Sequence, residues 1–250
     1  MEIKDIFKEL DERASYMAPG HLRRWLTGQI EEYSSQHQDD PEGLCALYNE
    51  VGAIHKNAGE YDKAEEAFMT AKQLLETDIE TELSVNGSFA EDGEDVRSKQ
   101  AININGSESP ELATTLSNLA EIYRLTGRAD EAMKALTRAE EIYDLDAGTV
   151  PPELFCGVLI DKSALLMAKE EFDPAFDSLA KALEYACNRE KKNFSLIGTI
   201  FYNLGRAMEG LNGPQQASEL YGKGAEWFKA ASGEDSEGYK QCMERIEALK

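Results

Sequence analysis

Large apolar residues recur along this chain at spacings of three, four and seven, with small residues at fixed points between them. Such spacings place side chains on one stripe of an α-helix. In each recurrence a small residue, named here the anchor residue, is followed twelve positions later by an alanine. Small residues facing each other predict two antiparallel helices in close contact. The four pairs are Gly52 with Ala64, Ala120 with Ala132, Ser163 with Ala175, and Gly205 with Ala217.

The helix ends are marked by proline and glycine. Proline followed by glutamate precedes the first three anchors, at Pro41, Pro110 and Pro152. Proline at the first helical position has no N–H to leave unpaired, and the acid favours the positive end of the helix. Gly59, Gly127 and Gly213 are expected to end the first helix of three pairs. In the third pair the segment 169–172 has no glycine.

This pattern resembles the tetratricopeptide repeat (TPR). Successive anchors lie 43 residues apart from Ala120 to Ser163 and 42 apart from Ser163 to Gly205, more than the period of about 34 usual for that repeat. The longer form is similar to the repeats of kinesin light chains and many bacterial relatives. Lys162 stands at a position where this repeat prefers a large apolar residue. The proline usual near the end of the repeat motif is also absent. The resemblance implies an all-α fold, a right-handed α-solenoid of antiparallel helix pairs.

We expect one solenoid domain over residues 1–250, because repeats of this kind stack on their neighbours. Its expected parts are a capping helix pair (1–38), repeat 1 (41–78), an acidic insertion (79–108), repeat 2 (109–146), repeat 3 (151–189), repeat 4 (194–231) and a capping helix (233–250).

The insertion enlarges the gap between the first two anchors to 68 residues. Between Glu76 and Ser109 it carries eight acidic and two basic residues. Alternating apolar residues in 81–85 and 101–105 permit two short strands and a small β-hairpin. A mobile acidic loop is the alternative. Long insertions are often functional when ordered.

The charge balance narrows the choice of partner. The chain has 26 Lys and Arg against 48 Asp and Glu, a formal net charge of −22. Such a surface repels phosphate backbones and anionic lipid, so a protein or peptide partner is expected and nucleic acid or membrane is not. The acid excess can also serve solubility alone.

We expect a cytoplasmic protein without cofactor, metal or catalytic activity. No secretory signal and no apolar stretch of about 20 residues is present. The four cysteines lie far apart, form no CxxC pair and do not cluster with the three histidines, which indicates reduced thiols and no metal site. No phosphate-binding glycine loop, HExxH or GxSxG motif occurs.

In the tetratricopeptide family, residues beside the buried stripe of each first helix line a concave groove and commonly contact peptides. Asn118 and Asn203 hold the same position in their repeats, and an asparagine amide can bond both N–H and C=O of an extended peptide. Solvated helix-face asparagines are the alternative. The predicted binding residues are Asn49, Glu50, Ser117, Asn118, Glu121, Asp161, Tyr202, Asn203 and Arg206.

The resemblance implies an interaction scaffold that binds a basic or polar segment. Arg206 is the one cation among the predicted binding residues, and Glu121 and Asp161 oppose an anion. We therefore expect no clamp for a C-terminal carboxylate. Two alternatives remain open: a self-assembling structural protein, with homo-oligomers possible, and a regulatory sensor of a short peptide.

Overall fold

The computed structural model describes residues 2–37, 40–86, 109–145 and 148–250, without the side chains of 77–86. Within these residues the chain forms eleven helices and no strand. They fall into two compact units, Met1–Leu145 and Asp146–Lys250, and each unit is described by itself. No helix in the described ranges has both the length and the apolar content needed to cross a membrane.

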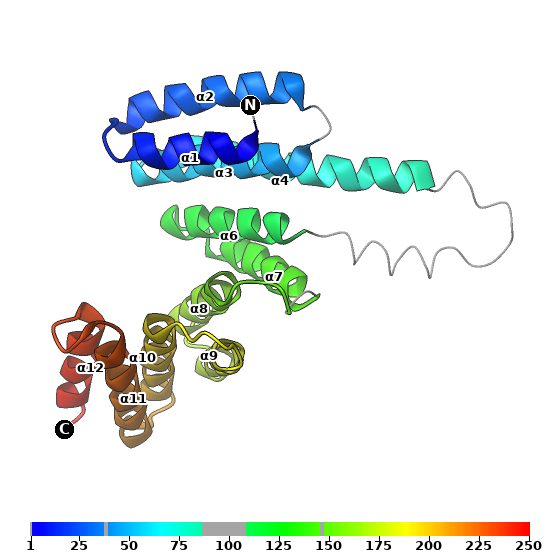
Figure 1. Cartoon of the computed structure of the whole chain (residues 1–250). Coiled ribbons are helices and arrows are strands. Elements are labelled where there is room, and N and C mark those ends of the chain that lie inside the picture. Colours follow the sequence, from blue (N-terminus) through cyan, green and yellow to red (C-terminus); the bar gives the residue numbers. More distant parts are fainter. Residues whose placement is uncertain (1, 38–39, 87–108, 146–147) are drawn as a thin grey trace, which may run out of the picture. The chain divides into compact units, whose positions relative to one another are not determined.

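The first unit is built from three helix pairs (Figure 1). In each pair the second helix returns along the first, and α4 packs against α6 of the next pair. The helices are α1 (Ile3–Ala14), α2 (Pro19–Gln36), α3 (Pro41–Asn57), α4 (Tyr61–Asn86), α6 (Pro110–Leu125) and α7 (Ala129–Leu145).

The second unit contains two helix pairs and one further helix. Helix α10 packs on α9 and α11, and α12 packs on α11. The helices are α8 (Pro152–Ala168), α9 (Phe172–Cys187), α10 (Phe194–Gly210), α11 (Pro214–Ser232) and α12 (Glu237–Ala248). All-α architecture is thus confirmed for the described residues, and the expected single domain stays a prediction.

The anchor residues and their partner alanines lie where the two helices of each pair touch. Ala64, Ala132, Ala175 and Ala217 have no exposed surface, and Ala120 and Ser163 are buried. Large apolar side chains on the same stripes fill the rest of the core, as the spacing predicts.

A left-handed backbone follows the first helix of each of the four repeats, seven residues after the anchor. Gly59 and Gly127 have φ values of 74° and 80° there. The equivalent residues of the last two repeats are not glycine: Glu170 has φ 61° and Asn212 has φ 58°. The prediction that Gly213 ends the first helix of repeat 4 is therefore wrong. Asn212, a residue type that tolerates the left-handed conformation, stands at the position of Gly59 and Gly127.

Helix α4 continues beyond the expected end of repeat 1. Its backbone is helical to Asn86, so the strand predicted at 81–85 is wrong. No proline or glycine interrupts the sequence between Tyr61 and Asn86, and the alternating apolar residues lie on a continuing helix. The second predicted strand, 101–105, lies outside the described residues.

Candidate partner-binding surface

In the first unit the predicted binding residues lie on α3 and α6, and two of them, Asn49 and Asn118, bond to each other. The Asn118 amide donates to Asn49 Oδ1 over 3.1 Å, and Asn49 Nδ2 donates to Thr115 Oγ1 over 2.9 Å. The Thr115 hydroxyl in turn donates to the Glu111 carbonyl over 2.9 Å. This directed chain, named here the amide ladder, joins the first helices of two repeats. Asn49 and Asn118 are half-buried and are not free, solvated asparagines.

The predicted acidic residues of this unit differ in their surroundings. Glu121 accepts a hydrogen bond from Lys56 Nζ at 2.5 Å, so its charge is neutralised across α3 and α6. Glu50 is half-buried and makes no hydrogen bond or ion pair with any residue that the structure describes. Burial, and then the nearby Asp11 on α1, raise the pKa of the Glu50 carboxyl. A half-buried carboxylate without a cation is costly, and a cationic ligand would lower that cost.

Ser117 completes the predicted set in the first unit. Its hydroxyl donates to the Ala113 carbonyl over 2.9 Å, one turn earlier in α6. A serine bonded to its own helix keeps its lone pairs for a further donor.

In the second unit the predicted residues differ in their surroundings. Tyr202 packs against the hydrophobic cluster of Ala217, Tyr221, Ala225 and Cys242, on which α12 lies. Asn203 is only 8% exposed. Its amide donates to the Thr199 carbonyl over 3.0 Å and accepts from Arg206 over 3.2 Å. Arg206 and Asp161 are exposed.

The equivalence of Asn118 and Asn203 therefore holds in sequence but not in environment. Asn118 reaches across to a neighbouring repeat, whereas Asn203 bonds within α10. The residues that sequence reasoning missed are Thr115, Lys56 and Asp11. Lys56 had a signal, because it lies on the same helix as Gly52 and opposite Glu121 in a stacked array. Thr115 had no such signal, because a threonine on the buried stripe of a helix is expected to be an ordinary core residue.

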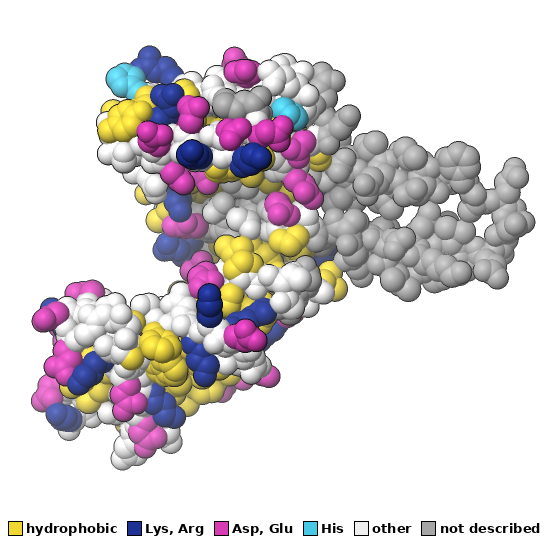
Figure 2. All heavy atoms as spheres, viewed as in Figure 1, with side chains coloured by type: hydrophobic (Ala, Val, Ile, Leu, Met, Phe, Trp, Pro, Cys, Tyr) yellow, Lys and Arg dark blue, Asp and Glu magenta, His cyan; other side chains and the backbone are white. Residues whose placement is uncertain are grey.

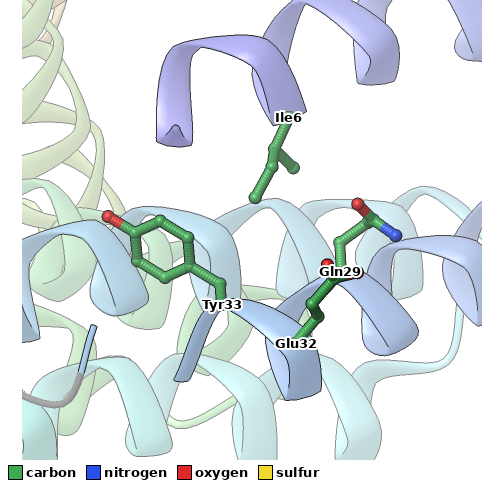
Figure 3. A pocket seen from close by; sticks show the side chains of 4 residues that line it. All are labelled: Ile6, Gln29, Glu32 and Tyr33. Atoms are coloured by element: carbon green, nitrogen blue, oxygen red, sulfur yellow. The ribbon is translucent and has the colours of Figure 1, made fainter. Parts of the chain in front are cut away.

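A second feature of the first unit is a shallow hollow between α1 and α2. Figure 3 shows its lining, Ile6 from α1 with Gln29, Glu32 and Tyr33 from α2. The space has no room for a water molecule. The Gln29 carbonyl oxygen has no hydrogen-bond partner among the described residues. The hollow therefore offers no enclosed space for a ligand.

The cysteines and acidic residues do not form a reactive or metal-binding centre in the described ranges. No group of three or more His, Cys, Asp or Glu side chains is arranged there to hold a metal ion. The thiols of Cys45, Cys156, Cys187 and Cys242 are free. Burial raises the pKa of Cys156 to about 12 and that of Cys242 to about 11, so neither forms a thiolate readily.

Two family models for the tetratricopeptide repeat match the chain, one over residues 46–74 and one over 98–144. A curated relative, kinesin light chain-related 3 of Arabidopsis thaliana, is 26% identical over 113 residues. The match covers 43% of this chain and 17% of the plant protein. The chain thus spans about a sixth of that relative's length.

Solved structures share the fold. BtubC (BKLC) of P. vanneervenii has a TM-score of 0.72 at 18% identity, covering 92% of this chain and 81% of its own. A kinesin-light-chain-like protein of Podospora anserina has a TM-score of 0.62 at 13% identity, with coverages of 92% and 96%. PlcR of Bacillus thuringiensis, in complex with the peptide PapR7 and DNA, has a TM-score of 0.53 at 15% identity, with coverages of 99% and 73%.

Residues 46–74 and 98–144 thus match the tetratricopeptide repeat, and the fold of the chain is that of kinesin-light-chain-like repeat structures, as the anchor spacing predicts. Folds of this kind place the first helices of successive pairs side by side. The amide ladder is the bonded form of that arrangement in the first unit.

Proposed function

We propose that this chain is a non-enzymatic interaction scaffold that binds a basic or polar segment of a partner on the first helices of its repeats. The repeat fold supports a protein or peptide partner, and PlcR, of similar fold, was solved with a bound peptide. The acid excess disfavours nucleic acid and anionic membranes as partners. Free thiols are consistent with the cytoplasm as its location.

The observation that carries the proposal is the unpaired Glu50 carboxylate. It lies half-buried on α3 near the second carboxylate of Asp11. Burial and the nearby Asp11 raise the pKa of the Glu50 carboxyl, and a Lys or Arg side chain beside Glu50 would favour its charged form. A partner's basic residue would therefore bind between α1 and α3.

The amide ladder supplies the second contact. Asn118 gives one N–H to Asn49, which leaves its carbonyl oxygen and second N–H for a ligand. An amide already polarised by a chain of hydrogen bonds is a stronger partner than an isolated one. An amide bonds the peptide backbone whatever the peptide's side chains are. Specificity would therefore come from the Glu50 site, which selects a cation, and affinity from the Glu50 site and the Asn118 amide together.

The test is binding of a fluorescent peptide array to the full chain, followed by Glu50→Lys. We expect peptides with Lys or Arg to bind, and Glu50→Lys to weaken them about tenfold or more, since a cation then faces a cation. Glu66→Lys is the matched control, because Glu66 is exposed on α4 and its carboxylate has no partner among the described residues. Equal loss in both variants would show bulk charge attraction and refute the site.

The same purified chain also tests the two alternative functions, self-assembly and peptide sensing. Sedimentation of the full chain over a wide concentration range tests the first, and a concentration-independent monomer counts against a structural polymer. A peptide-sensing regulator would need a third component whose affinity changes when the peptide binds. Capture of the partner with and without peptide measures that change.

A further inference from the structure

The fourth repeat begins differently from the other three. Repeats 1 to 3 start with proline and glutamate, and α10 starts instead with Asn193-Phe194-Ser195 after Lys191 and Lys192. The Asn193 side chain caps the helix by accepting from the Leu196 N–H over 3.0 Å. No acidic residue lies in the first turn of α10. Phe194 and Ser195 thus stand where the other repeats carry proline and glutamate, and two lysines precede them.

The aromatic ring at this helix start is exposed and paired. Phe194 is 40% exposed, and its ring contacts Trp227 of α11 edge to face, with centroids 5.2 Å apart. Figure 2 shows a hydrophobic patch over α10 on the face of the second unit that it displays. Aromatic pairs held in this way offer a rigid apolar contact area, which is typical of binding surfaces.

Lys191 and Lys192 precede Phe194 in the chain by three and two positions. Lys191 and Lys192 are exposed and form no ion pair with any residue that the structure describes. The nearby Arg189 is engaged, since it donates to the carbonyls of Gly148 and Val150. The Glu153 carboxylate accepts from Asn193 Nδ2 over 2.9 Å. In a chain with 48 acids and 26 bases, 189–192 is the one run of four residues with three basic side chains.

We propose that Lys191, Lys192, Phe194 and Trp227, named here the lysine–aromatic surface, bind an acidic segment of another protein that carries a large apolar side chain. The apolar side chain would cover the exposed edge of Phe194 beside Trp227. Carboxylates on either side of it would meet the two lysines. Burial of aromatic surface supplies affinity, and the charges select the partner and its orientation.

The lysine–aromatic surface is separate from the Glu50 site of the proposed function, because it uses other residues and selects a ligand of the opposite charge. The Glu50 position selects a cation, whereas the lysine–aromatic surface selects anions. A scaffold with both would hold two chemically different segments at once.

The test uses Trp227 as its reporter in the full chain with Trp25→Phe, which leaves one tryptophan. The probe is a synthetic peptide with one leucine flanked by aspartates and glutamates. We expect a saturable change in Trp227 emission. The same peptide with serine in place of leucine, or with lysines in place of the acids, should bind at least about tenfold more weakly.

Variants of the surface locate the binding. Lys191→Glu with Lys192→Glu should weaken the acidic peptide about tenfold, because two attractions become repulsions. Lys4→Glu with Lys8→Glu makes the same charge change at exposed lysines of α1 and should leave affinity within about twofold. Phe194→Ser tests the apolar contact, with circular dichroism confirming that the helices persist.

Four results would overturn the proposal: no saturable signal, equal loss in both lysine variants, equal binding of the leucine and serine peptides, or unchanged affinity after the lysine reversals. Self-association abolished by the lysine reversals would assign the surface to a second copy instead. Glu50→Lys should leave the acidic peptide unaffected. Failure of the Glu50 site and failure of this surface are therefore distinguishable.

Discussion

The ring of Phe68 occupies the space that a side chain on residue 52 would need. A β-carbon built on Gly52 would lie 2.4 Å from Phe68 Cε1, and one on Gly205 would lie 2.7 Å from Tyr221 Cε1. In both cases the aromatic residue follows the anchor by sixteen positions. The same position after Ala120 and Ser163 is leucine, Leu136 and Leu179. A glycine anchor thus accompanies an aromatic ring, and a larger anchor accompanies leucine.

Gly52→Ala should destabilise the first unit by about 1–3 kcal/mol, because the new methyl group overlaps the buried ring of Phe68. Replacing Phe68 by leucine as well recreates the Ala120–Leu136 pair. We expect the double variant to be more stable than the sum of the single effects by at least about 0.5 kcal/mol. Urea unfolding of the four proteins measures this coupling.

Gly28→Ala is the matched control for the glycine change. Gly28 lies inside α2, and nothing is within 4 Å of a β-carbon built there. Alanine should stabilise the helix at this position by about 0.5–1 kcal/mol. If Gly52→Ala were equally stabilising, the close approach of Phe68 would not constrain the anchor.

Glu170→Gly should stabilise the second unit by up to about 1 kcal/mol. Glu170 has φ 61°, in the left-handed region. This conformation is unfavourable for a residue with a β-carbon but not for glycine. The neighbouring Glu171, also exposed, has φ −88°. Glu171→Gly should therefore give no gain. Thermal unfolding of the two variants decides, and equal effects would refute strain at Glu170.

The Glu60 carboxylate should make the first unit acid-sensitive. His55 Nδ1 lies 2.6 Å and Arg23 Nη1 2.7 Å from Glu60 Oε2, and these contacts, His55 first, lower the pKa of Glu60 below its ordinary value of 4.5. A carboxyl with a depressed folded pKa contributes stability above its unfolded pKa and loses it as pH falls through the folded value.

Glu60→Gln should therefore lower stability at neutral pH and converge with the original protein at strongly acidic pH. Urea unfolding at a series of pH values gives the comparison. Glu66→Gln, at an exposed residue of α4, serves as control. A constant difference between the two curves at every pH would contradict a role for the Glu60 charge.

Arg245→Met should loosen α12. Arg245 donates to both carboxylate oxygens of Glu209 on α10, with Nε 3.1 Å from Oε1, and the Tyr221 hydroxyl donates to the same carboxylate. Hydrogen exchange of α12 should accelerate in the variant while α8 stays protected. Lys250→Met removes the exposed Lys250–Glu247 pair and should change little, as expected for a surface ion pair.

The repeat architecture was predictable because it depends on short-range spacing. Small anchors, partner alanines and proline starts each have one physical reading, and the helix pairs follow from them. The turn of the third repeat was harder, since Glu170 fills a glycine position at a cost that sequence does not reveal. The alternating apolar residues of 81–85 led to a wrong prediction of a strand. Alternation over so few residues is also compatible with a helix that no proline or glycine interrupts.

The candidate surface was predictable only in part. Position within the repeat places Asn49 and Asn118 on facing helices, but their mutual hydrogen bond depends on the distance between α3 and α6. Tyr202 and Asn203 were predicted from the position that they hold in the fourth repeat. The packing of Tyr202 against the cluster that includes Cys242 of α12 depends on a helix outside the repeat pattern, so the repeat position alone does not give it.

Helix α12 has a consequence for how such a protein can grow. Cys242 places its sulfur beside Gly224, 3.1 Å from where a β-carbon would be, and closes the face of α11 on which a further repeat would stack. A repeat that follows α12 in the chain could not stack on that face of α11. A duplicated pair inserted between α11 and α12 could stack there, with α12 then covering the new pair.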